Sequence, residues 1–155
     1  MIGKLKALLF KGGGRTDKAE NDDEAIRLAT AALLAETAMM DGCFDEDERH
    51  VVLSILQRHF GLNEGEAQDL MEAGRTKVED SSQLYGFTRT LKDHFSQEQR
   101  IAMIEMLWEV AYADGHVHHF ESNLVRRVAG LIYVTDRESG EARKRVSRKV
   151  ESGNQ

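Results

Sequence analysis

An Asp-Gly pair occurs twice in this chain, and a glutamate follows each pair at the same distance. Asp41 begins the first motif and Glu48 lies seven positions later; Asp114 and Glu121 have the same spacing. Carboxylate oxygens are the ligands that calcium, magnesium and manganese prefer in proteins. Four carboxylates in two copies of one motif therefore predict binding of a divalent cation.

The two motifs belong to a longer internal repeat with an offset of 73 residues. Residues 31–56 share seven identities with the segment 73 positions later, where about one or two are expected by chance. Glu36 and Glu109 form one identical pair, five positions before each Asp. Five residues turn roughly 140° around an ideal helix. These two glutamates therefore reach the same ligand only if the last turn unwinds or if they meet the other repeat.

Helix capping is the alternative explanation for the same residues. The glycine after each Asp is a natural left-handed helix terminator, and Asp45 with Glu48 fits the reciprocal pairing that caps a helix start. The second copy fits less well, because His118 replaces Asp45 while Glu121 is retained. The helix dipole also disfavours Asp at a helix C-terminus, by about a few tenths to 1 kcal/mol. The repeated motif therefore favours ion binding, and capping stays open.

The motif differs from an EF-hand, whose loop of about 12 positions has glycine sixth. Asp41 to Glu48 spans eight positions, with glycine second. The second copy also carries His116, His118 and His119, which shift its preference toward zinc unless they belong to a solvated polar loop. The ion is therefore calcium, magnesium, manganese or zinc.

Helices must position these residues, because the chain has no proline and is rich in helix-forming residues. The expected fold is all-α, with helices at residues 22–40, 46–60, 64–73, 81–93, 97–113, 119–133 and 136–150. Their starts are marked by a capping residue followed three positions later by Glu or Gln. The pairs are Asn21 with Glu24, Asp45 with Glu48, Asn63 with Glu66, Asp80 with Gln83, Ser96 with Gln99, and Thr135 with Glu138.

Aromatic residues and glycines inside the predicted helices indicate where the core lies. Phe87, Trp108 and Tyr112 are expected core side chains, since large aromatic groups in amphipathic helices face inward. Gly86 and Gly130 lie inside helices, where glycine costs about 1 kcal/mol relative to alanine. Close helix crossings are the expected reason for them.

Charge is distributed unevenly along the chain. Residues 1–15 and 143–155 each carry +4, whereas residues 16–142 carry −14, with 12 basic and 26 acidic side chains. Nucleic-acid-binding proteins present a basic face, so no nucleic acid is expected; metal ions and basic protein partners are favoured. A single cysteine excludes an internal disulfide. No secretory signal and no apolar run of about 20 residues is evident, which predicts a cytoplasmic protein.

The chain divides into four segments. Residues 1–11 form a short basic amphipathic segment, residues 12–20 a flexible Gly-rich tether, residues 21–150 one helical domain and residues 151–155 a disordered tail. Peripheral contact with an anionic membrane is one expectation for the first segment. Docking of its apolar side on the bundle is the equal alternative.

At the two Asp-Gly motifs the chain resembles the TerB-like family, helical bacterial proteins named from tellurite-resistance operons. The matching features are Ala-Met-Met-Asp-Gly (38–42) with Glu48 and Ala-Tyr-Ala-Asp-Gly (111–115) with Glu121. The resemblance covers residues 22–150. It implies a compact bundle of about seven helices from two related helix-loop-helix halves, an acidic surface able to bind metal, and a link to stress responses at the inner membrane.

Two functional hypotheses follow. Neither Ser54, Ser96 nor Cys43 has an evident base and orienting group in the sequence, so the protein is not expected to be an enzyme. The preferred hypothesis is a non-enzymatic cytoplasmic module with an acidic divalent-cation-binding surface, acting in stress or tellurite resistance as the resemblance implies. The alternative is a metal-independent protein-interaction module that docks basic partners or the membrane surface.

Overall fold

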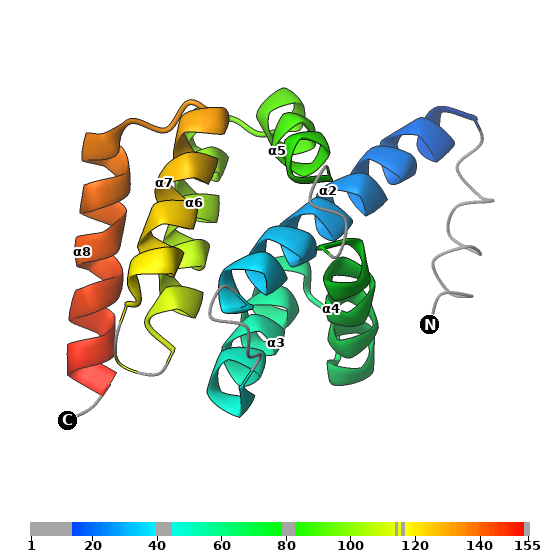
Figure 1. Cartoon of the computed structure of the whole chain (residues 1–155). Coiled ribbons are helices and arrows are strands. Elements are labelled where there is room, and N and C mark those ends of the chain that lie inside the picture. The colour runs from blue at the N-terminus through cyan, green and yellow to red at the C-terminus, as the bar shows by residue number, and fades with distance from the viewer. Residues whose placement is uncertain (1–13, 40–44, 79–82, 114, 116, 154–155) are drawn as a thin grey trace.

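Capping residues and long proline-free stretches produce the all-helical chain expected from the sequence. The computed structural model describes residues 14–39, 45–78, 83–113, 115 and 117–153. Within these ranges there are seven α-helices and no strand (Figure 1). They are α2 (Gly14–Ala38), α3 (Glu46–Phe60), α4 (Glu64–Val78), α5 (Gln83–His94), α6 (Gln97–Ala111), α7 (His119–Leu131) and α8 (Asp136–Gly153).

Four of the predicted capping pairs begin helices as expected. The Glu48 amide donates to Asp45 Oδ1 at 2.8 Å ahead of α3, and Ser96 and Gln99 form both halves of a capping box ahead of α6. Such caps satisfy amide donors of the first turn and contribute about 1 kcal/mol each. Asp80 of a fifth pair lies outside the described residues. The remaining confirmed pairs are Asn63 with Glu66 and Thr135 with Glu138.

Helix α2 begins earlier than predicted. It starts at Gly14, so residues 14–20 of the expected tether are helical and Asn21 lies within the helix instead of beginning it. No glycine or proline interrupts the helix after Gly14, and each residue added to an existing helix gains a hydrogen bond, so the helix propagates back to the glycines. Likewise α8 continues to Gly153, which makes residues 151–153 helical where a disordered tail was predicted.

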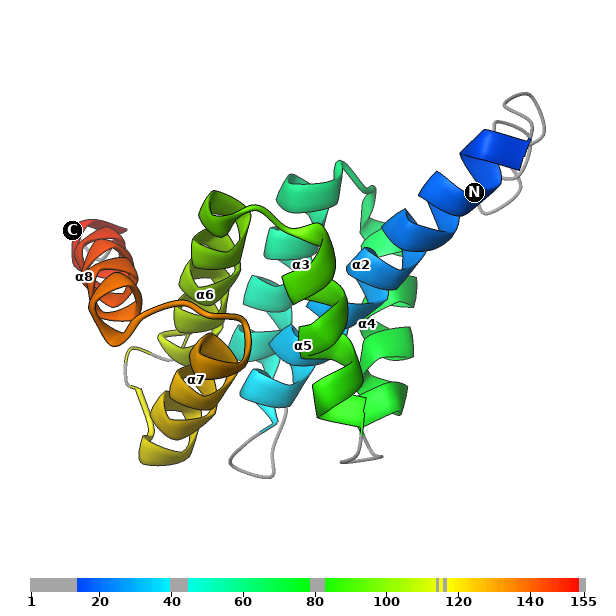
Figure 2. The ribbon, with the colours of Figure 1, turned by 90° about the horizontal axis from the view of Figure 1, so that it is seen from above.

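Helix α2 is the centre of the bundle. It packs against α3, α4, α5, α6 and α7, while α8 packs on α6 and α7; Figures 1 and 2 show α8 at the far edge. From Ala29 to Ala38 every α2 side chain except Glu36 is buried. A helix that is apolar all round belongs in the interior of a protein. Its alanines leave room for neighbouring helices on several sides.

A close helix crossing lies at Gly74 of α4, not at the glycines that the sequence pattern singled out. A Cβ atom on Gly74 would lie 2.7 Å from the backbone of both Ala31 and Ala32 in α2. By contrast, a Cβ atom on Gly86 or Gly130 would have nothing within 4 Å. The prediction that close crossings explain Gly86 and Gly130 is therefore wrong, because sequence alone does not identify the side of a helix that meets a neighbour.

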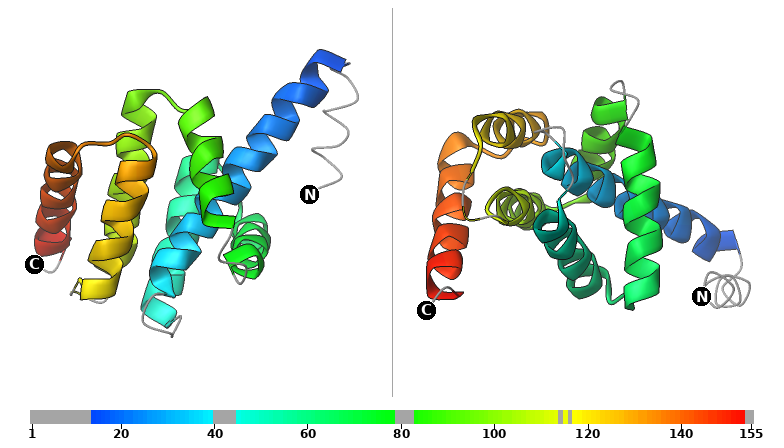
Figure 3. Two further views of the ribbon diagram at one scale, coloured as in Figure 1. Left: turned by 45° about the horizontal axis from the view of Figure 1, so that its top comes forward. Right: turned by 60° about the horizontal axis from the view of Figure 1, so that its bottom comes forward.

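The two sequence repeats form two helix-loop-helix units, α2–α3 and α6–α7. The units interlock: α2 contacts α6 and α7, and α6 contacts α3. In Figures 1 and 3 the carboxyl ends of α2 and α6 and the amino ends of α3 and α7 lie on the same side of the bundle. We call this side the motif end, because both Asp-Gly motifs follow α2 or α6 in the chain.

Two of the three predicted core aromatics are buried. Trp108 is 2% exposed and Phe87 is 9% exposed, whereas Tyr112 is only partly buried. The Trp108 indole N–H donates to Ser139 Oγ at 3.2 Å, which ties α6 to α8. The Arg143 guanidinium lies 4.7 Å from the Trp108 ring centroid and donates from Nε to the Tyr112 hydroxyl at 3.1 Å. This cation–π contact is worth about 0.5–1 kcal/mol or more when desolvated.

Candidate functional site

The predicted ligands divide into those that the structure describes and those that it does not. Asp41 and Asp114 lie outside the described residues, as does Gly42. Gly115 of the second motif has φ +89°, and its amide donates to the Tyr112 carbonyl at 2.9 Å. A positive φ of this size suits glycine. The helix itself ends earlier, at Ala111 with Tyr112 as its C-cap residue, so Gly115 lies in the turn after α6 and the prediction that it terminates the helix is wrong.

Glu48 and Glu121 occupy equivalent positions, each the third residue of its helix. Each is only 3% exposed. The Glu48 amide binds the Asp45 carboxylate, and Glu121 Oε1 accepts from the His118 amide at 3.1 Å. Capping is therefore present in both copies, but through different side chains: Asp45 caps α3 in the first copy, and Glu121 itself accepts the capping hydrogen bond in the second. The positive end of the helix dipole also favours an anionic side chain there.

Capping alone does not account for the burial of these two glutamates. Like Glu121, Glu66 and Glu138 accept from the amide of the residue that precedes their helix, yet both are partly exposed. A carboxylate can therefore cap a helix in this protein without leaving solvent. Burial of an ionised carboxylate costs free energy unless polar or charged groups compensate it. Glu48 and Glu121 are therefore the most unusual acidic side chains of the motif end.

The described carboxylates do not gather into one cage. Helices α3 and α7 do not pack extensively on each other, since α2 and α6 lie between them. Within the described ranges, no three His, Cys, Asp or Glu side chains come close enough to hold a metal ion together. Because Glu48 and Glu121 belong to helices that do not pack extensively on each other, the two motifs are considered separately.

Glu36 and Glu109 meet the other repeat, one of the two arrangements that the sequence left open. Glu109 of α6 binds Arg58 of α3, with 3.0 Å between Oε2 and Nη2. Burial raises the pKa of Glu36 in α2, and the field of Arg127 in α7 lowers it in part. In both cases an arginine on the second helix of one repeat compensates a glutamate on the first helix of the other. The positive charge of these arginines disfavours a cation beside Glu36 and Glu109.

Comparison with known families identifies the fold. The family model described as Tellurite resistance protein TerB matches residues 27–144, which include both repeats. The chain belongs to the TerB family. Comparisons with curated proteins and with solved structures gave no match. The TerB assignment confirms the resemblance at the Asp-Gly motifs and places this domain among proteins related to tellurite resistance.

The described part of the TerB-family chain contains no helix long and apolar enough to cross a membrane. The predicted membrane-contacting segment, residues 1–11, lies outside the described residues. His116 lies outside them as well. His118 precedes α7 as its N-cap residue, and His119 begins the helix with its ring exposed to solvent.

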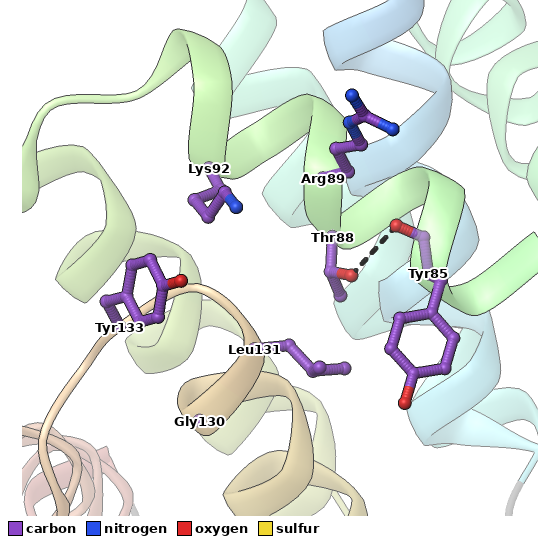
Figure 4. A pocket seen from close by; sticks show the side chains of 7 residues that line it. All are labelled: Tyr85, Thr88, Arg89, Lys92, Gly130, Leu131 and Tyr133. Carbon is purple, nitrogen blue, oxygen red and sulfur yellow. Dashed lines mark hydrogen bonds between the residues drawn. The ribbon is translucent and has the colours of Figure 1, made fainter.

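Sequence reasoning missed a groove of the TerB domain between α5 and α7, which we call the α5–α7 groove. Its main hollow has a volume of about 370 Å³, and a second hollow of about 240 Å³ adjoins it through Tyr85 and Leu131. Figure 4 shows Leu131 between Tyr85 and Tyr133. The one feature of the sequence that indicated this groove was Gly130, a glycine inside a helix where no close packing requires it. The lining residues of both hollows are Leu84, Tyr85, Thr88, Arg89, Lys92, Arg127, Gly130, Leu131 and Tyr133.

Proposed function

We propose that this TerB-family domain is a non-enzymatic module that binds divalent cations at its two Asp-Gly motifs. Asp41 and Glu48 are the principal ligands in the first motif, and Asp114 and Glu121 in the second. The observation that carries the proposal is the equal burial of Glu48 and Glu121, each 3% exposed at the same position of its helix. The setting of this module is tellurite resistance or a related stress response.

Electrostatics supports cations as the ligands. Residues 16–142 carry a net charge of −14, so cations are concentrated around the domain. A cation beside a buried carboxylate stabilises its ionised form. Carboxylate oxygens fit calcium, magnesium or manganese, and the histidines of the second motif also suit zinc. We therefore assign one cation to each motif, with Glu36 and Glu109 outside the primary ligands.

Isothermal titration calorimetry with calcium, manganese and zinc tests this assignment. Wild type is expected to bind two ions, and Asp41→Asn and Asp114→Asn are each expected to abolish one of the two binding events. The matched control is the double variant Asp69→Asn, Glu98→Gln, which removes the same charge from exposed positions of α4 and α6. It is expected to bind as wild type does.

Equal heats from wild type and the Asp41→Asn, Asp114→Asn double variant would remove both proposed sites. Equal losses in this variant and in the control would show that general charge, not these ligands, attracts the ions. Zinc binding lost only with Asp114→Asn would assign the zinc preference to the second motif, as its histidines suggest.

A metal-independent interaction module is the second candidate. It is supported by Arg58, which forms an ion pair with Glu109, and by the net charge of −14 of residues 16–142, which suits basic partners. Co-sedimentation of chelator-treated protein with anionic vesicles, with and without residues 1–11, tests the membrane version. Loss of pelleting on deletion supports contact through this segment, and unchanged pelleting rules it out.

A further inference from the structure

The α5–α7 groove is apolar in its floor and exposes two aromatic rings. Leu131 lies between Tyr85 and Tyr133 (Figure 4), which are 70% and 65% exposed. Large aromatic side chains are usually buried, and exposed tyrosines beside a hollow are typical of protein-binding surfaces. Of the three large exposed hydrophobic side chains among the described residues, two line this one groove.

The rim of the groove is basic. Arg89 and Lys92 of α5 lie along one side, and Arg127 of α7 lines the adjoining hollow. Lys92 Nζ lies 5.2 Å from the centroid of the Tyr133 ring. Arg89 Nε lies 3.8 Å from Asp93 Oδ2, and both side chains are largely exposed. Three of the 12 basic side chains of an otherwise acidic segment thus line one groove.

The backbone of the groove is shaped by the end of α7, a Schellman C-cap in which the Val134 amide donates to the Ala129 carbonyl at 2.8 Å and the Tyr133 amide to the Gly130 carbonyl at 3.4 Å. Tyr133 is the one residue other than glycine with a positive φ, +61°, within the described ranges. Side chains rarely adopt this conformation, and Gln97 Nε2 supports the turn by donating to the Tyr133 carbonyl at 3.2 Å. A Cβ on Gly130 would point into open space. The turn presents an aromatic ring, and Gly130 leaves the groove wall open beside it.

We propose that the α5–α7 groove docks a short acidic segment of a partner protein, with an apolar side chain of that segment seated on Leu131 between the two tyrosines. Charge complementarity selects this occupant, because Arg89, Lys92 and Arg127 match carboxylates on either side of an apolar anchor. Basic residues 1–11 of this chain have the wrong charge for the rim.

The acidic body limits the length of the polyanion that the groove accepts. Charges are screened within roughly 8 Å at physiological salt, so a short segment experiences mainly the basic rim. A nucleic acid or an anionic membrane extends beyond it over a domain whose residues 16–142 carry a net charge of −14. The groove is also separate from the motif end: Glu121 and Gly130 lie nine residues apart on α7, roughly 14 Å along the axis. Docking in the groove therefore does not depend on cation binding.

Peptide arrays test the occupant. Peptides of about 12 residues are displayed in three classes with the same apolar positions and with acidic, neutral or basic residues between them. The full-length protein is expected to bind the acidic class preferentially at about 0.15 M salt. No preference for the acidic class, or preference for the basic class, would overturn the proposal.

Fluorescence anisotropy with the best acidic peptides locates the binding surface. The Arg89→Gln, Lys92→Gln double variant is expected to bind about tenfold more weakly, as for the loss of two partly exposed ion pairs. The matched control is Arg137→Gln, Lys144→Gln on exposed positions of α8, which is expected to change affinity by less than about twofold. Equal affinities of the two double variants would place binding outside the groove.

A variant that tests the aromatic contribution without straining the backbone is Tyr133→Gly, since glycine adopts a positive φ freely. It is expected to keep its helical circular dichroism and to lose peptide affinity; unchanged affinity contradicts a role for the ring. A short DNA duplex and phosphatidylglycerol vesicles complete the set. If either binds more tightly than the acidic peptides and loses affinity with Arg89→Gln, Lys92→Gln, the occupant is a polyanion or a membrane, and the proposal is wrong.

Discussion

Gly74→Ala is the substitution whose effect follows most directly from the structure. Its Cβ would lie 2.7 Å from backbone atoms of Ala31 and Ala32, about 0.8 Å short of a favourable carbon contact. Backbone atoms do not rotate away as a side chain does, so α4 must move relative to α2. Overpacking of this kind costs about 1–3 kcal/mol, and rigid neighbours on both contacts place this case near 3 kcal/mol.

Alanine also favours the helix by about 1 kcal/mol relative to glycine. The net expectation for Gly74→Ala is a loss of about 2 kcal/mol in the free energy of unfolding. Gly86→Ala is the matched control, because it makes the same chemical change in α5 where nothing lies within 4 Å of the new Cβ. It is expected to gain roughly 0.5–1 kcal/mol.

Urea denaturation followed by far-ultraviolet circular dichroism measures both variants against wild type. The unfolding midpoints are expected to move in opposite directions, with an unchanged denaturant slope. If Gly74→Ala is as stable as Gly86→Ala, α2 and α4 do not cross closely at Gly74, and the packing described for the centre of the bundle is wrong.

The remaining predictions concern a helix cap and two carboxylates. Ser96→Ala removes the cap of α6 and is expected to cost about 1 kcal/mol; an unchanged urea midpoint would contradict this role. Burial raises the pKa of Glu36, so ionisation of this side chain opposes folding as pH rises through its unfolded-state and then its folded-state pKa. Glu36→Gln is therefore expected to raise the free energy of unfolding at about pH 7 and to have no effect at about pH 3. Hydrogen bonds from Thr135 lower the pKa of Glu138, so ionisation of this side chain favours folding. Glu138→Gln is therefore expected to lower the free energy of unfolding at about pH 7 and to equal wild type in stability at about pH 3. Urea midpoints of both variants, measured against wild type at the two pH values, test these expectations. Changes of stability in the same direction for the two variants at about pH 7 would contradict these assignments.

Local signals predicted the helices well because their causes are local. A capping pair such as Ser96 and Gln99 acts within four residues, and its hydrogen bonds form wherever the chain goes in space. The largest difference, the start of α2 at Gly14 instead of Asn21, has a local cause too. Helix propagation extended through residues without a breaker, although a capping signal was present. Helices α4 and α8 end at Val78 and Gly153, beyond their predicted ends at residues 73 and 150.

The candidate site was only partly predictable. The repeat and the helix positions of Glu48 and Glu121 follow from spacing along one chain, but their burial depends on helices distant in sequence. The pairing of Glu109 with Arg58 likewise joins residues 51 positions apart. No pattern within one helix indicates such a partner, because two helices determine it together.

The sequence by itself determined an all-α TerB-family fold, its two repeats, most helix boundaries and the acidic residues of the Asp-Gly motifs. All of these depend on neighbours within a few positions or on direct comparison along the chain. Only the tertiary structure decided that Gly74 lies at a close crossing, that arginines of one repeat compensate glutamates of the other, and that basic and aromatic side chains of α5 and α7 form a groove. These features arise where helices meet, and their meeting is set by packing of the whole core.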